Sequence, residues 1–107
     1  RPIANFQAIR HKIAEMATKT AASRTLTWDT LRRLEEGENV VREVSMAKLF
    51  TQRTLVEIAD EAVQIHGGYG YMKEYEVERA LRDARLGPIG GGTDEIMKEI
   101  IGKTYGL

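Results

Sequence analysis

The chain has 107 residues, of which 42% are hydrophobic and 30% are charged, a composition that is typical of one folded domain and argues against disorder. The 16 basic and 16 acidic residues balance to a net charge of zero, so the chain lacks the basic excess of a general nucleic-acid-binding protein. Cysteine is absent, which excludes disulfides and thiolate metal sites.

The sequence shows neither a membrane-spanning segment nor a signal peptide. No apolar run approaches the roughly 20 residues that cross a bilayer, and the first residues lack the apolar segment of a signal peptide. A first residue other than Met suggests processing, or a piece of a longer protein. We expect a cytoplasmic protein, or one of the mitochondrial matrix in a eukaryote.

A long first helix is predicted over residues 6–35. Asn5 is its candidate N-cap, and apolar residues recur at a spacing of three to four from Phe6 to Leu34. Threonines in the middle lower the helix propensity, so a break between Ser23 and Thr27 is the alternative. Unbroken, the helix spans about 45 Å, which is more than an isolated small domain needs and hints at a larger assembly.

A second helix is predicted over residues 40–66. Gly37 can adopt the left-handed conformation that ends the first helix, and Asn39 can cap the second. Apolar residues lie on two sides of the second helix, so we expect burial from two directions, as in the central helix of a bundle or at a subunit contact. Gly67 and Gly68 end it.

The remaining chain reads as shorter pieces. We expect a loop over residues 69–74, a charged helix over residues 75–86 that ends at Gly87 and Pro88, and a last helix over residues 94–104. Thr93 is a good N-cap for that last helix, and the acids Asp94 and Glu95 suit its first turn. No stretch alternates as a strand does, so the predicted fold is an all-α antiparallel bundle.

Glycines gather in two clusters, at residues 67–70 and 90–92. The second cluster precedes a capped helix, so its backbone N–H groups are unobstructed and suit a carbonyl oxygen, a carboxylate or a phosphate. A flexible joint is the simpler alternative. Neither cluster fits the Walker loop or the dinucleotide-binding fingerprint, because the required flanking residues and strand are missing.

Several other residues have plain structural interpretations. His66 is expected to cap helix carbonyls, and it lies too far from His11 for the two to form a metal site. Trp28 and Phe50 are expected in a core or an interface. The charge run over residues 78–85 is expected to be a solvated face, with contact to another chain as the alternative.

Blocks along the whole chain resemble the C-terminal helical domain of the acyl-CoA dehydrogenase family. They occur in the family's order and spacing, and they comprise Gln64 to Tyr75, Val77 to Arg79, Arg82 to Arg85, Ile89 with Gly92 to Ile96, and Ile3 to Gln7 with Ala14 to Ala17.

The resemblance implies one domain over residues 1–107 that lacks the first helix of the family's bundle and belongs to a longer subunit. Members hold FAD and oxidise an acyl-CoA thioester to the trans-2-enoyl-CoA, and their electrons pass to an electron-transfer flavoprotein. The implied assembly is a homo-oligomer, either a dimer or a tetramer. No nucleic acid, metal or membrane span is implied.

Carried over position by position, the resemblance assigns the FAD contacts to the start of the first helix, to the turn after the second helix and to the start of the last helix. These residues are Phe6, Gln7, Gln64, Ile65, His66, Gly67, Gly68, Thr93, Asp94 and Glu95. The turn after the second helix is implied to contact the cofactor of a neighbouring subunit.

Gly91 and Gly92 correspond to substrate-binding positions. Many family members carry the catalytic glutamate at the position of Gly91, so no catalytic residue is assigned here. In long-chain and isovaleryl-type relatives this position is also glycine and the base comes from the preceding helix. The backbone N–H of Gly91 remains able to donate to the thioester carbonyl.

The chain by itself is therefore expected to be inactive. A rival function is that of a non-catalytic helical module for oligomerisation or interaction, which the two-sided second helix and the overlong first helix favour. A third possibility is an enzyme of this fold with a related substrate or with lost activity.

Overall fold

The computed structural model describes residues 2–107, and within that range it contains helices and no strands, which confirms the all-α prediction. The elements in chain order are the short 3-10 helix η1 (Ile3–Asn5), α1 (Gln7–Glu35), α2 (Val41–His66), α3 (Gly68–Tyr71), α4 (Glu76–Ala84) and α5 (Asp94–Thr104).

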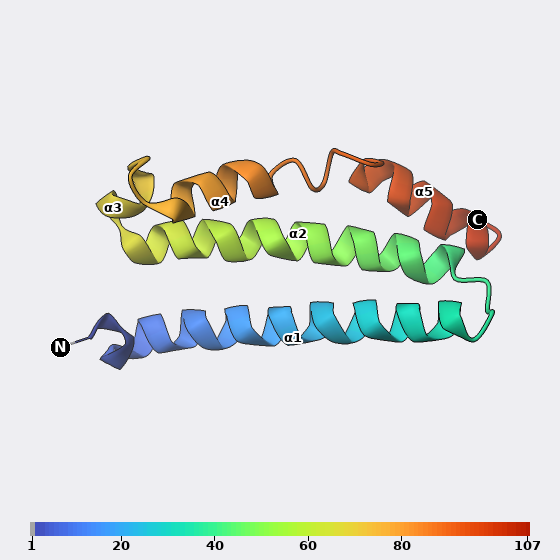
Figure 1. Cartoon of the computed structure of the whole chain (residues 1–107), viewed down its shortest axis with the longest axis horizontal. Coiled ribbons are helices and arrows are strands. Elements are labelled where there is room, and N and C mark those ends of the chain that lie inside the picture. Colours follow the sequence, from blue (N-terminus) through green and yellow to red (C-terminus); the bar gives the residue numbers. More distant parts are fainter. Residues whose placement is uncertain (1) are drawn as a thin grey trace.

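The helix α2 lies at the centre of the molecule (Figure 1). It runs antiparallel to α1 on one side, and α4 and α5 follow one another along its other side. Within residues 2–107, α1 contacts neither α4 nor α5. The two apolar sides of α2 therefore have separate partners, which confirms the predicted burial from two directions.

This arrangement is elongated. The molecule measures 52 × 24 × 24 Å and has a radius of gyration of 16.6 Å, whereas a compact domain of this length has about 13 Å. Its accessible surface is 7624 Å², compared with roughly 6,000 Å² for a compact monomer of the same mass. Among the described residues 2–107, four hydrophobic residues are buried, namely Val40, Ala59, Ala84 and Met97.

The helix α1 runs unbroken through its threonine-rich middle, so the alternative of a break is wrong. The hydroxyl groups of Thr18, Thr20, Thr27 and Thr30 each donate to the carbonyl oxygen four residues earlier, at 2.8 Å. These bonds keep the hydroxyls occupied within the helical conformation, so they do not compete with it.

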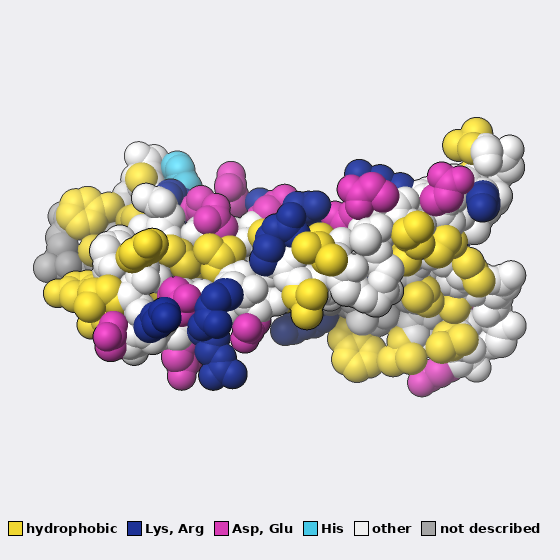
Figure 2. Space-filling view, turned by 90° about the horizontal axis from the view of Figure 1, so that it is seen from above, with side chains coloured by type: hydrophobic (Ala, Val, Ile, Leu, Met, Phe, Trp, Pro, Cys, Tyr) yellow, Lys and Arg dark blue, Asp and Glu magenta, His cyan; other side chains and the backbone are white. Residues whose placement is uncertain are grey.

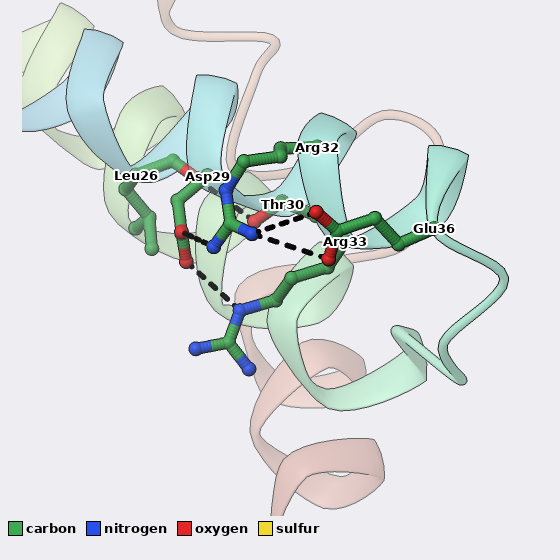
Figure 3. A network of polar contacts seen from close by, with 6 residues as sticks. All are labelled: Leu26, Asp29, Thr30, Arg32, Arg33 and Glu36. Carbon is green, nitrogen blue, oxygen red and sulfur yellow. Dashed lines mark hydrogen bonds and ion pairs between the residues drawn. The ribbon is translucent and has the colours of Figure 1, made fainter.

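Ion pairs stabilise the last turns of α1 (Figure 3). Arg32 lies between two acids, with Nη2 2.7 Å from Asp29 Oδ1 and Nη1 3.1 Å from Glu36 Oε1. Arg33 Nε donates to the other oxygen of Asp29 at 3.0 Å. The hydrogen bond from Arg32 is the largest of the effects that lower the pKa of the Asp29 carboxyl.

Two capping predictions need adjustment. Asn5 does not cap α1, because the turn η1 includes it and moves the start of α1 one residue further; its carbonyl oxygen accepts from Arg10 Nη1 at 2.6 Å. Asn39 lies one residue before the N-cap of α2, which is Val40, although its Oδ1 accepts from the N–H of Val41 at 3.1 Å. Gly37 is left-handed as predicted, with φ of 83°.

The segment after α2 was predicted as a loop, and this is wrong for its first part. Residues Gly68–Tyr71 form one helical turn, α3, which packs on α2 and α4. The rings of Tyr69 and Tyr75 then contact each other with centroids 5.3 Å apart. The bounds of α5 agree with the prediction, while α4 is shorter than predicted at both ends.

Candidate functional site

The second glycine cluster leads directly into α5. Gly91 and Gly92 both have positive φ, at 65° and 106°, which side chains rarely tolerate. The Thr93 hydroxyl then accepts from the N–H of Ile96 at 3.2 Å, so the predicted N-cap is confirmed. The chain thus turns sharply and starts a helix of 11 residues.

This turn presents a row of unpaired donors. Among residues 2–107, the backbone N–H groups of Gly91, Gly92 and Thr93 have no hydrogen-bond acceptor. Gly91 is exposed, and a Cβ added there would meet no atom within 4 Å. Free N–H groups at the positive end of a helix dipole favour a carbonyl oxygen or an anion.

The two acids at the start of α5 have different environments. The side chain of Asp94 is only 4% exposed, and its Oδ2 lies 2.6 Å from Nη2 of Arg53 on α2. Its N–H donates to the carbonyl of Pro88 at 2.9 Å. Glu95 is exposed and makes no ion pair within the described part of the chain. Asp94 therefore joins α5 to α2, and Glu95 remains accessible.

A hollow of about 500 Å³ lies beside the glycine loop. Its lining comes from one face of α2, the end of α4 and the loop, and comprises Lys48, Gln52, Asp83, Leu86, Gly87, Gly90 and Gly91. Lys48 Nζ donates to the carbonyl oxygen of Gly87 at 2.8 Å and also to that of Gly92. The free N–H of Gly91 thus belongs to a loop that borders this concave surface.

The first glycine cluster ends α2. His66 Nδ1 lies 2.7 Å from the carbonyl oxygen of Ala62, which confirms the predicted contact with helix carbonyls. Gly67 has φ of 61°, whereas Gly68 begins α3 with no positive φ. A Cβ added at either glycine would meet no atom within 4 Å. Open space therefore adjoins the backbone of both residues.

The residues assigned to FAD form two groups in this chain. Phe6 and Gln7 start α1 at the end of the molecule where α2 stops and α3 lies, and the other group starts α5 (Figure 1). Lys48, which contacts the second cluster, and His66 are 18 residues apart on α2, or about 27 Å. The chain does not bring the two clusters together, so a site that uses both takes them from different subunits or spans that distance.

Three side chains of α2 that contact this region escaped sequence reasoning. Gln52 lies one turn after Lys48 and Arg53 follows directly, and all three contact residues about 40 positions later in the chain. In the sequence, Gln52 and Arg53 follow Lys48 by four and five residues, which places the three near one another on the helix surface. This spacing does not reveal which residues they contact.

Aromatic side chains gather at the α3 end of the molecule. Tyr69, Tyr71 and Tyr75 are 63%, 85% and 41% exposed. Seen from the side of α4 and α5, hydrophobic groups are extensive at both ends of the molecule, and charged groups lie along most of its length (Figure 2). Those charges include ion pairs within α4, such as Arg82 Nε with Glu78 Oε1 at 2.9 Å.

Known proteins resemble the chain along its whole length. The family described as acyl-CoA dehydrogenase, C-terminal domain, matches residues 1–106. An acyl-CoA dehydrogenase of Bacillus subtilis is 50% identical over 103 residues, which are 96% of this chain and 27% of that protein. The caffeyl-CoA reductase-Etf complex subunit CarC of Acetobacterium woodii is 46% identical over 99 residues, which are 92% of this chain and 26% of that protein.

Solved structures agree. An acyl-CoA dehydrogenase from Geobacillus kaustophilus has a TM-score of 0.96 at 41% identity, covering 100% of this chain and 28% of its own. An FAD complex of PigA has a TM-score of 0.93 at 27% identity, covering 98% of this chain and 27% of its own.

The chain spans about a quarter of the length of the curated relatives that it matches. Within that quarter, both the sequence match and the superposition extend over nearly every residue. The chain therefore belongs to the acyl-CoA dehydrogenase family, of which it carries the C-terminal helical domain.

Proposed function

We propose that residues 1–107 are the C-terminal part of a longer FAD-dependent acyl-CoA dehydrogenase subunit, which oxidises an acyl-CoA thioester to the trans-2-enoyl-CoA. The observation that carries this proposal is the row of unpaired N–H groups from Gly91 to Thr93 at the start of α5, in a chain of this family. The part in hand supplies cofactor contacts, a substrate contact and subunit contacts.

The described residues fit FAD. The start of α5 offers N–H groups and a helix dipole to the phosphates, and the open backbone at Gly67 and Gly68 allows a planar group to approach. The Thr93 hydroxyl can donate to a phosphate, whereas the exposed Glu95 carboxylate suits a hydroxyl or amino donor of the nucleotide and the side chain of Asp94 is already paired with Arg53. The similar PigA structure holds FAD, which when bound supplies the acceptor for the hydride of the substrate.

Gly91 has a separate role in this proposal. Its N–H donates to the thioester carbonyl oxygen, where negative charge develops as the α-proton leaves. One such donor typically contributes about 10²–10³ in kcat. Glycine has no carboxylate, so the base that removes the proton lies outside residues 1–107, on the preceding helix of the longer subunit.

The surface supports assembly into a homo-oligomer. The excess of roughly 1,600 Å² over a compact monomer is about twice the roughly 800 Å² that one partner contributes to a standard protein interface. Large apolar residues on α1 and α2 contribute to it, among them Trp28 at 61% and Val44 at 49% exposure. We propose that the rest of the subunit and further copies of it cover this surface.

A second candidate is the reverse reaction, the reduction of an enoyl-CoA thioester. The relative from Acetobacterium woodii, at 46% identity, is named a caffeyl-CoA reductase, and the same name includes an Etf complex. Stabilising the charge on a thioester oxygen serves both directions equally. The electron partner that we propose is an electron-transfer flavoprotein in either case.

The test compares the complete subunit with the isolated 107-residue chain. Each is supplied with FAD, a series of acyl-CoA thioesters and an artificial electron acceptor, and enoyl-CoA formation is measured. We expect product from the complete subunit and none from the chain alone.

Enoyl-CoA formation by the isolated chain would show that its catalytic base lies within residues 1–107. A complete, folded subunit that binds FAD but converts no acyl-CoA or enoyl-CoA would contradict the enzyme proposal. If the complete, folded subunit bound no FAD, the interaction module would be the better function.

A further inference from the structure

On the basis of the proposed function, we infer that Lys48 is a positioning residue, which fixes the loop of residues 87–92 and with it the direction of the Gly91 N–H. Lys48 lies in the middle of α2 and is half-buried. Its ammonium group reaches residues that are 39 and 44 positions later in the chain.

The contact joins the two ends of the loop through one side chain. Lys48 Nζ donates to the carbonyl oxygens of Gly87 and Gly92, the first and last residues of the segment. Within residues 2–107, no other side chain forms a hydrogen bond to this segment. An ammonium group has three donors, and these two carbonyls use two of them.

The backbone alone holds only part of the loop. Ile89 and Gly90 both donate to the carbonyl of Leu86, at 2.9 and 2.7 Å. Asp94 donates to the carbonyl of Pro88 at 2.9 Å. The N–H groups of Gly91 and Gly92 make no such bond, and three consecutive glycines have the largest conformational freedom of any sequence. Lys48 restrains the end of the loop that the backbone leaves free.

Gln52 packs beside the same loop one turn further along α2. A Cβ added at Gly87 would collide with the side chain of Gln52, so the glycine allows α2 and the loop to approach closely. Lys48, Gln52 and Gly91 line one hollow. The loop therefore packs on one face of α2, and the side chains of that face determine how the loop is oriented.

Position matters here because the stabilisation of a developing negative charge depends steeply on geometry. A donor contributes fully when it lies about 2.7–3.1 Å from the oxyanion. A displacement of about 1 Å can lower a rate by about 10². Removal of the Lys48 ammonium should therefore lower the rate of the chemical step more than it lowers the affinity for the substrate.

The test uses the complete subunit with FAD bound and three variants. Lys48→Met removes the charge and keeps the length of the side chain, and Lys48→Arg keeps the charge and the donors. Lys103→Met is the matched control, because Lys103 is exposed at the last turn of α5 and its side chain makes no hydrogen bond or ion pair within residues 2–107.

We expect Lys48→Met to lower kcat by about 10- to 100-fold, with KM changed less than about threefold. Flavin content and the unfolding midpoint should stay close to those of the unchanged enzyme. Lys48→Arg should recover most of the lost kcat, and Lys103→Met should match the unchanged enzyme in all four measurements.

A spectroscopic measurement tests the contact between the Gly91 N–H and the thioester carbonyl without requiring turnover. The probe is 4-(dimethylamino)cinnamoyl-CoA, an enoyl thioester whose absorption moves to longer wavelength when its carbonyl is polarised. We expect the bound probe to show a clear shift in the unchanged enzyme and in Lys103→Met, and a smaller shift in Lys48→Met at saturating probe.

Two results would overturn the role of Lys48 while leaving the proposed function intact. One is a Lys48→Met enzyme with unchanged kcat and an unchanged probe shift. The other is a loss of flavin or of folded protein that accounts for the whole loss of kcat. That pattern is expected if Lys48 only stabilises the fold and does not position the Gly91 N–H. In contrast, an unchanged subunit that binds FAD and shows neither turnover nor a probe shift would contradict the proposed function itself.

Discussion

Single glycines in this chain serve different physical purposes, although they share a cluster. Gly67 has φ of 61°, so a side chain there strains the backbone. Gly68 has no positive φ, and a Cβ at that position meets open space. Of these two glycines, Gly67 is required by the fold of the chain, whereas a requirement for Gly68 must come from a group outside it.

This contrast yields a prediction for Gly68→Val in the complete subunit. We expect FAD affinity to fall by about tenfold or more, because the added branch occupies the space of the cofactor, while the fold tolerates the new side chain. Flavin content after gel filtration and the unfolding midpoint of the flavin-free protein measure the two effects separately.

Gly67→Val is the comparison variant, and it should lower both quantities because its backbone is strained. If Gly68→Val lost folded protein and flavin to the same extent, a cofactor contact at Gly68 would have no support.

At the scale of elements, α5 is joined to α2 by charged and polar contacts at both of its ends. Arg53 pairs with Asp94 at the start of α5. Arg42 Nη2 donates to the carbonyl of Thr104 at 2.7 Å at its end, and the Arg42 guanidinium lies 3.8 Å from the centre of the Tyr105 ring. These contacts set where the glycine turn stands relative to α2.

We predict that Arg53→Met destabilises the attachment of α5 strongly. The Asp94 carboxylate is buried, its Oδ1 has no partner within the described residues, and the variant leaves the whole group unpaired. Breaking a buried pair typically costs about 3–5 kcal/mol, and we expect about 2 kcal/mol because Arg53 is itself half-exposed. Urea unfolding of the 107-residue chain, followed by circular dichroism, measures this.

Arg79→Met is the control for this change. Arg79 is 76% exposed in its pair with Asp83, so its loss should change the unfolding midpoint little. Equal midpoints for Arg53→Met and Arg79→Met would show that the pair between α2 and α5 adds no stability.

At the scale of the whole molecule, a central helix with partners on two sides leaves much apolar surface uncovered. Because α1 does not contact α4 or α5, the bundle is open along the sides of α2. Trp28, Leu31 and Leu34 near the end of α1 are 61%, 38% and 54% exposed. Exposed apolar surface of this extent is typical of a site of contact with other protein.

We therefore predict that the isolated chain associates with itself at micromolar concentration. Trp28→Lys should shift the molecules toward monomer, since it replaces a large apolar contact with a charge. Light scattering coupled to gel filtration measures the mass. Thr25→Lys, at an exposed polar position of the same helix, should leave the mass unchanged.

A chain that stays monomeric with Trp28 intact would contradict this view of the surface. An equal effect of Thr25→Lys and Trp28→Lys would instead point to general charge repulsion, without a specific contact at Trp28.

Local sequence features were sufficient for much of the fold. The three-to-four periodicity predicted α1, α2 and α5 almost to the residue, and Thr93 was correctly identified as a cap. Two of the wrong predictions concern short segments. Asn5 lies one residue before the N-cap of α1, and Gly68–Tyr71 forms a helical turn where the end of a helix and a loop were expected. Glycine-rich segments have weak preferences of their own, so packing on α2 decides their conformation.

By itself, the sequence determined the four longer helices, the two glycine clusters and the family, because periodicity, caps and the order of motifs can be read along the chain. Only the tertiary structure decided that Asp94 is buried against Arg53 and that Lys48 holds both ends of the glycine loop. These contacts join residues about 40 positions apart, and no local pattern specifies such partners. They attach the glycine loop and the start of α5 to α2.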